Sequence, residues 1–416
     1  RGASFATPVI TGLLCKALRN DLSPQKALIY LQDNASCIVK GIETGRPEPL
    51  HIRSANIFPL NKETLALAEH ADMLSFQIKH IFDLKYSGNI GKKLSAVVYP
   101  GCRLCDSVEN LVIESIDDVD WSDETDTMII GHINMVSKAL RHSNLKTALL
   151  QKCRESQKQV YLYDAVDCPT DILINCKKER IRMPSVTKKD VPKNRYGKLH
   201  QVSSPVLGIF GTSPKQGKFT LQLNLRQYMQ KAGYQVASLG TEPEAELFGF
   251  EGVYPMGYNS AVEISGEQAV LYVNYLMSEI DYQSPDLIIV GSQSQTIATG
   301  SESIGFMAIS QHELILGSQP DAYVLCVNTT DELEYIERTI RFLTSVTSAR
   351  VISFAVFPLI YKNEEGFLTN VLGRAEDFRI QQFIGKLENV FGIHAYSMDD
   401  PKLLENLKSE IITFFS

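Results

Sequence analysis

Apolar runs of strand length alternate with longer amphipathic segments over two stretches of this chain, residues 51–176 and 205–416. In the second stretch, the apolar runs predict strands at 205–210, 234–239, 286–290, 321–327, 351–357 and 393–397. Helices are predicted between them at 218–231, 268–279, 331–344, 376–390 and 401–415. Thr330 is the expected N-cap of the third helix. Because this alternation favours parallel strands with helical crossovers, it predicts a doubly wound α/β domain whose ligand sites lie beyond the carboxyl ends of its strands.

The first stretch shows the same alternation with shorter runs. Apolar runs typical of strands occupy 55–60, 77–82, 95–99, 127–130 and 160–163, and helices are predicted at 62–76 and 135–156. We interpret this stretch as a Rossmann-like domain. It contains no GxGxxG motif, so the sequence offers little support for dinucleotide binding there.

The remaining pieces are shorter. The pattern of residues 1–50 predicts two helices, at 8–18 and 24–32, and Ser23 is the expected N-cap of the second. Residues 177–204 form a linker rich in lysine and arginine. This linker is either a solvated connection or an extended segment draped on a domain, and the alternative is a basic surface for an acidic peptide or phosphates. The predicted division is therefore 1–50, 51–176, 177–204 and 205–416.

Composition limits the function classes. Hydrophobic residues make up 44% and charged residues 21% of the chain, as in globular proteins, and no apolar run reaches bilayer length. The net charge of -7 argues against a dedicated nucleic-acid binder. The eight cysteines are too sparse for a disulfide scaffold, so we predict reduced thiols and a cytoplasmic location. Cys102 and Cys105 form a single CxxC, which we interpret as ordinary thiols. A zinc site would need further ligands, for which Cys168 and Cys176 are the alternative.

A loop between the predicted strand 205–210 and the helix 218–231 has the features of a phosphate-binding P-loop. Its glycines allow a tight turn with inward N–H groups, the helix N-terminus adds positive charge, and Lys218 can reach outer phosphates. The spacing departs from GxxxxGK[ST], with five residues between the glycines and Phe219 after the lysine. The alternative is a tight turn with an exposed lysine. The predicted nucleotide-binding residues are Gly211, Thr212, Ser213, Lys215, Gly217, Lys218, Phe219 and Thr220.

A metal-binding acid is expected to complete such a site. The strand 286–290 is followed by Gly291-Ser292-Gln293-Ser294-Gln295, which has no acid at the Walker B position. Glu242, Glu244 and Gln293 are the candidate metal or polar site, with a solvated loop as the alternative for the two glutamates. Binding is therefore more strongly predicted than hydrolysis.

Two motifs carry a family resemblance over residues 54–416. The loop Gly211–Thr220 follows the spacing G-T-D-x-x-V-G-K-x-T-T, and Gly317–Ala322 follows G-x-x-P-D-A. On these motifs the chain resembles a bacterial family with a Rossmann-like N-terminal and a P-loop C-terminal domain. This family includes enzymes proposed as D-glutamate N-acetyltransferases and is distantly similar to dethiobiotin synthetase. The resemblance implies coenzyme A-dependent N-acyl transfer, but Gly291–Gln295 lacks the glutamate of the family's E-G-Q-G-S, and Ser213 replaces its loop aspartate.

A second motif points to peptide chemistry. Gly240-Thr241-Glu242-Pro243 resembles clostridial peptide-maturation proteins that are encoded beside radical enzymes and bacteriocin-like precursors. The resemblance implies that the bound nucleotide drives modification of a ribosomally made peptide or switches a conformation.

Residues 1–36 resemble the end of a subtilisin-like serine protease. Gly2-Ala3-Ser4-Phe5-Ala6-Thr7-Pro8, with Gly12, matches the G-T-S-x-A-x-P-x-x-x-G pattern around the nucleophile. The resemblance makes Ser4 the nucleophile. Subtilisin-type chains run Asp, His, Ser, so both partners would precede residue 1. We therefore expect this chain to be the C-terminal portion of a larger protease fusion, with Ser4 inactive by itself.

The sequence thus predicts a P-loop protein that acts in peptide maturation and binds ATP or GTP with Mg²⁺. The alternatives are serine endopeptidase activity of a longer parent and an acyltransferase that binds acyl-coenzyme A. The predicted partner is a precursor peptide or a small-molecule substrate, without nucleic acid or membrane. Assembly into a homo-oligomer is left open.

Overall fold

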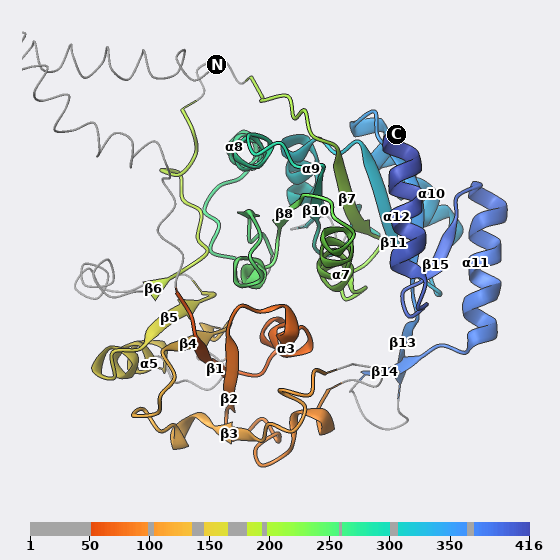
Figure 1. Cartoon of the computed structure of the whole chain (residues 1–416). Helices are drawn as coiled ribbons and strands as arrows, with labels where there is room; N and C mark the ends of the chain where they lie inside the picture. The colour runs from red at the N-terminus through yellow and green to blue at the C-terminus, as the bar shows by residue number, and fades with distance from the viewer. Residues whose placement is uncertain are drawn as a thin grey trace, which may run out of the picture. The chain divides into compact units, whose positions relative to one another are not determined.

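The computed structural model describes residues 51–98, 104–134, 145–164, 181–193, 198–257, 260–299, 307–363 and 370–416. Ile52–Ser416 forms one unit by its internal contacts and contains two parallel β-sheets (Figure 1). The predicted helices and nucleophile within residues 1–50, Ser4 included, lie outside the described residues. So do Cys102, Cys168 and Cys176.

The first sheet has six parallel strands in the order β3-β2-β1-β4-β5-β6. The strands are β1 (Ser54–Phe58), β2 (Gln77–Asp83), β3 (Ile113–Ser115), β4 (Thr127–Ile130), β5 (Gln159–Leu162) and β6 (Ile181–Arg182). In the described part of the chain, its helices are α3 (Lys62–Glu69) and α5 (Leu145–Glu155). This strand order is that of the Rossmann fold, in which ligands bind beyond the carboxyl ends of the strands where the order reverses.

The second sheet has seven parallel strands in the order β15-β12-β11-β7-β10-β8-β9. The strands are β7 (Val206–Gly211), β8 (Val236–Gly240), β9 (Gly252–Val253), β10 (Leu287–Gly291), β11 (Ala322–Asn328), β12 (Arg350–Phe357) and β15 (Ala395–Ser397). A separate antiparallel pair is formed by β13 (Leu359–Asn363) and β14 (Asn370–Arg374). Because β7 lies inside the sheet with all six residues buried, its carboxyl end opens at the centre of the sheet edge.

Helices cover both faces of the second sheet (Figure 1). One face packs against α7 (Lys218–Lys231) and α12 (Leu403–Phe415). The other packs against α8 (Glu267–Asp281), α9 (Met307–Ser318), α10 (Leu333–Val346) and α11 (Asp377–Phe391). Successive residues of β7 enter opposite layers, as strand geometry requires: Leu207 and Ile209 face one, Val206 and Phe210 the other. The structure is therefore a mixed α/β fold with parallel sheets.

Several predicted elements differ in detail. The helix predicted at 62–76 ends at Glu69 and is followed by a short 3₁₀ turn, Ala71–Met73. The described part of the predicted strand 95–99, residues 95–98, begins within a 3₁₀ turn, Leu94–Ala96, and forms no strand. Helix α9 was not predicted, because its apolar residues lack a clear helical periodicity.

The predicted N-cap of α10 is wrong. Glu332 occupies the cap position in place of Thr330. Asp331, expected in the first turn, precedes the helix, and its carboxylate accepts hydrogen bonds from the Thr212 hydroxyl (2.5 Å) and the Asn328 backbone N–H (2.8 Å). The acid therefore links α10 to the loop after β7.

The described part of the basic linker packs along the protein. Ile181–Arg182 forms strand β6 of the first sheet, and Val186 makes a parallel bridge to Val262. The guanidinium of Arg182 pairs with Glu246 at 2.7 Å. This arginine is therefore neutralised by a carboxylate of the same chain.

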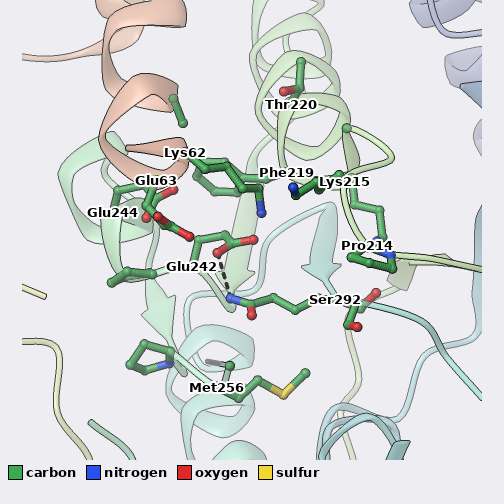
Figure 2. Close-up of a pocket in the computed structure, with 18 of the residues that line it drawn as sticks. Lys62, Glu63, Pro214, Lys215, Phe219, Thr220, Glu242, Glu244, Met256 and Ser292 are labelled. Carbon is green, nitrogen blue, oxygen red and sulfur yellow. Dashed lines mark hydrogen bonds between the residues drawn. The ribbon is translucent and has the colours of Figure 1, made fainter. Parts of the chain in front are cut away.

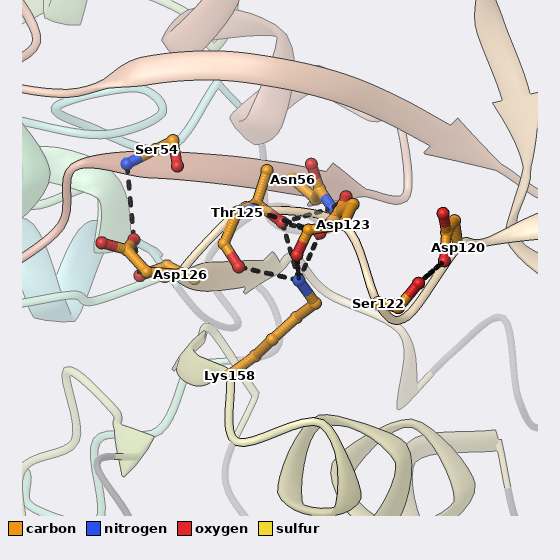
Figure 3. Close-up of polar contacts among 9 residues, drawn as sticks. Ser54, Asn56, Asp120, Ser122, Asp123, Thr125, Asp126 and Lys158 are labelled. Carbon is orange, nitrogen blue, oxygen red and sulfur yellow. Dashed lines mark hydrogen bonds and ion pairs between the residues drawn. The ribbon is translucent and has the colours of Figure 1, made fainter.

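A buried polar cluster joins strands of the first sheet (Figure 3). The Lys158 ammonium pairs with the Asp123 carboxylate and donates to the Thr125 carbonyl (2.7 Å) and hydroxyl (2.9 Å). The Asn56 amide donates to Asp123 at 2.8 Å and to Thr125 at 2.9 Å. Because a buried charge is stable only when paired and hydrogen-bonded, this cluster holds together β1, the turn before β4 and the start of β5.

Candidate functional site

The loop between β7 and α7 provides the central feature of the site. Gly217 and Lys215 both adopt left-handed backbone conformations, with φ of 68° and 58°. Gly217 is the N-cap of α7 and makes no side-chain cap, so side-chain capping does not occupy the N–H groups of the first turn. Successive turns of this kind form a concave nest of N–H groups that suits an anion.

Lys218 points into this loop. Its side chain is buried, and its ammonium donates to the Ser213 carbonyl at 2.7 Å. Burial lowers the pKa of Lys218 to about 8. A Cβ atom added to Gly211 would lie 3.3 Å from the ammonium nitrogen, so glycine is needed for the lysine to lie across the end of β7. The exposed-lysine alternative is thus wrong.

A glutamine amide occupies the interior of the loop. Gln216 is 1% exposed, and its Oε1 accepts a hydrogen bond from the Ser213 N–H at 3.0 Å. Its Nε2 donates to the Thr212 hydroxyl at 2.7 Å. The carboxamide oxygen therefore lies against an inward N–H and beside the lysine, where a phosphate oxygen would find the same donors. The hydroxyl of Thr212 is already engaged with Gln216 and Asp331.

The other predicted loop residues lie around this centre. The Phe219 ring packs against Phe248 and Phe250, with centroids 5.8 and 5.9 Å apart, and anchors the first turn of α7. The Thr220 hydroxyl is one turn along, 3.5 Å from the His70 Nε2. Lys215 is exposed at the rim.

A pocket of about 360 Å³ opens between the P-loop and the carboxyl edge of the first sheet. Figure 2 shows Lys62 and Glu63 of α3 facing the loop across this space, with Glu242 and Glu244 beside them. The volume falls in the range of small-molecule sites, which typically enclose 300–1,000 Å³. The pocket thus joins both sheets in one candidate site.

The predicted acid cluster forms one wall of the pocket. Gln293 Nε2 donates to the Glu242 carboxylate at 2.7 Å and to the Thr241 carbonyl at 2.6 Å. Burial raises the pKa of Glu242 and of Glu244. Both glutamates come after β8, directly before or within the 3₁₀ helix η4 (Pro243–Phe248). The solvated-loop alternative is thus wrong, because these carboxyl groups line a cavity.

A histidine and a buried aspartate lie at the carboxyl ends of two neighbouring strands of the first sheet. His132 follows β4, lines the pocket and holds its Nδ1 2.8 Å from the Asp164 carboxylate. Asp164 follows β5 and is 0% exposed. Its second oxygen accepts the backbone N–H groups of Ile133 and Asn134, each at 2.7 Å.

Comparison with known proteins bears on the second sheet. Residues 194–356 match the P-loop domain of DUF1611, a domain of unknown function. A crystal structure of a DUF1611 family protein from Anabaena variabilis aligns over 87% of this chain and 100% of its own, with 14% identity and a TM-score of 0.59. The likeness shows a shared fold. No curated protein matches the sequence.

Two further solved structures align weakly. Chloroplast FtsY from Physcomitrella patens aligns over 67% of this chain and 88% of its own, with 14% identity and a TM-score of 0.28. The 54 kDa signal recognition particle protein from Aeropyrum pernix, in complex with GDP, aligns over 68% of this chain and 67% of its own, with 15% identity and a TM-score of 0.29. Scores this low lie below the level at which we infer a shared fold. None of these matches shows a subtilisin-like segment or a peptide-maturation family.

The family-model match over residues 194–356 includes the P-loop, Glu242, Glu244 and Gln293. It does not include His132 and Asp164 of the first sheet. Sequence reasoning missed His132, Asp164 and Gln216. Each of the first two follows a predicted strand directly, so the rule that sites lie beyond strand ends was the available signal. No sequence pattern marked Gln216 as a site residue, because its amide turns inward only in the folded loop.

Within the described ranges of the chain, no group of three or more His, Cys, Asp and Glu residues is placed to hold a metal ion. No helix in the same ranges has the length and apolar character needed to cross a membrane. Cys105 is a free thiol 3.2 Å from the Asp72 carboxylate, and burial raises its pKa.

Proposed function

We propose that this chain binds a nucleoside triphosphate, ATP or GTP, with its phosphates in the P-loop. The proposal is based on the Gln216 carboxamide oxygen inside the loop, which accepts a hydrogen bond from the Ser213 N–H. The Lys218 ammonium lies against the same turn and donates to the Ser213 carbonyl. An N–H group that donates to a neutral amide oxygen forms a stronger hydrogen bond with an anionic oxygen. A phosphate would displace the amide and draw the lysine away from the Ser213 carbonyl.

Magnesium would enter this site with the nucleotide. Mg²⁺ keeps several water ligands and is held by one or two protein oxygens together with phosphate oxygens, so a preformed cluster is not required. Glu242 and the Thr220 hydroxyl line the pocket beside the loop and are the groups we assign to it. Bound there, Mg²⁺ would neutralise charge on the phosphates.

A second candidate ligand is an acyl-coenzyme A, which also carries phosphates. The segment after β10, Gly291–Gln295, bears on both candidates: it lacks the metal-binding acid of a P-loop NTPase, and it also lacks the glutamate of the acyltransferase motif that it resembles. Ser292 and Gln293 line the pocket instead. A phosphate ligand that needs no metal fits this substitution.

Isothermal titration calorimetry with ATP, GTP and acetyl-coenzyme A, each with and without Mg²⁺, tests the assignment. We expect saturable binding of ATP or GTP that strengthens with Mg²⁺. Binding of acetyl-coenzyme A alone, independent of Mg²⁺, would select the second candidate. Failure of all three ligands to bind would contradict the proposal.

Ligand affinity is also expected to depend on pH through Lys218. Burial places its pKa at about 8, below its ordinary value, so in the unliganded protein the ammonium is present below pH 8 and lost above it. A bound phosphate favours the ammonium. Affinity should therefore fall as pH rises through 8, by up to about tenfold for each further unit. Titrations between pH 7 and 9.5 measure this slope, and a flat profile would contradict the role of the lysine.

A group transfer from the P-loop ligand would bring a second substrate into the pocket. We propose a small molecule or the end of a precursor peptide, because the cavity has the volume of a small-molecule site. Participation in peptide maturation, a cytoplasmic location and assembly into a homo-oligomer stay predictions from the sequence. Peptidase activity through Ser4 stays one as well.

A further inference from the structure

The wall of the pocket opposite the P-loop has a histidine in a defined orientation. The Asp164 carboxylate accepts hydrogen bonds from two backbone N–H groups and lies 2.8 Å from the His132 Nδ1. A carboxylate only accepts hydrogen bonds, so Nδ1 carries a proton, and in the neutral imidazole Nε2 keeps its lone pair. The Tyr163 ring packs edge-on against the imidazole, with centroids 5.7 Å apart, and restricts its rotation.

The same wall contains two buried polar atoms without a hydrogen-bond partner among the described residues. These are the Tyr163 hydroxyl and the Glu244 Oε2, on side chains that are 1% and 2% exposed. Both residues line the pocket. Leaving a buried polar atom unpaired is costly, so these two unpartnered oxygens together indicate a place for a polar ligand group.

We propose that this wall is the binding site of a second substrate with a nucleophilic O–H or N–H group, and that His132 accepts the proton of that group. This inference rests on the proposed function, since the P-loop ligand supplies the group to be transferred. Tyr163 and Glu244 hold the polar end of the second substrate. Asp164 is a positioning residue, because it acts through the imidazole.

The step balances in atoms and electrons. The proton of the nucleophile goes to the His132 Nε2, and the electron pair of that O–H or N–H bond forms the new bond to the transferred group. The leaving group departs with the pair of the broken bond: a nucleoside diphosphate when phosphoryl is transferred, coenzyme A when acyl is transferred. Proton transfer of this kind typically contributes 10²–10⁴-fold to a rate.

Two readouts on the full chain test the proposal without a known second substrate. The first is the ¹⁵N NMR signature of the His132 ring, which we expect to show Nδ1–H and a bare Nε2 in the unmodified protein. The second is carbethoxylation by diethyl pyrocarbonate, followed residue by residue with mass spectrometry. His80 is the internal reference, because its Nδ1 also lies 2.8 Å from a carboxylate, that of Glu114, but it does not line the pocket.

The Asp164→Asn variant separates the effect of the His132 ring tautomer on the carbethoxylation rate from the effect of solvent access to the ring. The amide would donate to Nδ1 and move the ring proton to Nε2, so we expect carbethoxylation of His132 to slow at least about tenfold relative to His80. Saturating ATP with Mg²⁺ should protect His132 and leave His80 unchanged. If Asp164→Asn disturbs folding, the tautomer of the unmodified chain still decides.

Three outcomes would overturn the proposal. They are a neutral His132 ring with its proton on Nε2 in the unmodified chain, no difference between Asp164→Asn and the unmodified chain, or bound ATP that leaves the reactivity of His132 unchanged. Failure of ATP, GTP and acetyl-coenzyme A alike to bind would instead contradict the proposed function. The comparison with Asp164→Asn needs no ligand and separates the two failures.

Discussion

Lys218→Ala is expected to weaken the binding of ATP or GTP roughly 100-fold, equivalent to about 2.7 kcal/mol. The ammonium lies inside the P-loop, and a charge-assisted hydrogen bond to phosphate is among the stronger contacts that a protein offers. Removing it leaves the backbone N–H groups of the loop as the remaining donors. Isothermal titration calorimetry on the variant and on the unmodified chain measures the difference.

Two further variants show whether the effect comes from the ammonium. Lys218→Met keeps the aliphatic stem in its buried position, and we expect it to lose as much affinity as Lys218→Ala. Lys231→Ala removes an exposed lysine from the last turn of the same helix, whose ammonium donates to Gln227 at 2.8 Å, and should leave affinity unchanged. Equal affinity in Lys218→Met and the unmodified chain would show that the ligand does not contact this group.

Lys158→Met is expected to lower the free energy of unfolding by about 3 kcal/mol. The side chain is 3% exposed, and its ammonium is the partner of an Asp123 carboxylate that is 16% exposed. Deleting one partner of a buried ion pair leaves the other charge without compensation, which costs about 3–5 kcal/mol. We take the lower end because Asp123 retains some contact with water. Urea unfolding gives the value.

The matched control for this cluster lies on helix α5. Lys152→Met removes a lysine that is 57% exposed and pairs with Glu155 at 3.4 Å. Exposed pairs of this kind contribute about 0.5 kcal/mol or less, so the variant should unfold almost as the unmodified chain does. Similar losses in both variants would show that the buried cluster does not stabilise the first sheet.

Hydrophobic periodicity predicted most of the second sheet because its strands are buried on both sides. Residues 206–211 and 287–291 are entirely buried in the structure, and such runs stand out in the sequence. Helix α7 has the predicted bounds because Gly217 and Gly233 mark its ends. In the first sheet, short runs such as 95–99 carry too few residues for their period to be read.

The motif Gly317–Ala322 has a physical explanation that the sequence alone could not supply. A Cβ atom on Gly317 would lie 2.6 Å from the Val273 Cβ and 2.8 Å from the Val270 carbonyl oxygen, so the glycine permits close contact between α8 and α9. Asp321 accepts the Val206 N–H at 2.9 Å and aligns β11 with β7. The motif thus positions the strand that leads into the P-loop.

By itself, the sequence determined the α/β class, the strand–loop–helix context of the P-loop and the lysine at its centre. These are local properties, since burial period, glycine placement and helix capping act within about twenty residues. Only the tertiary structure decided that His132, held by Asp164, lines the same pocket as this loop, that Glu242 and Glu244 line it too, and that Gln216 lies inside the turn. The pocket brings together residues from segments far apart along the chain, and no local pattern records which strand ends meet there. The Gln216 contacts are local, but they depend on the turn that the folded loop adopts.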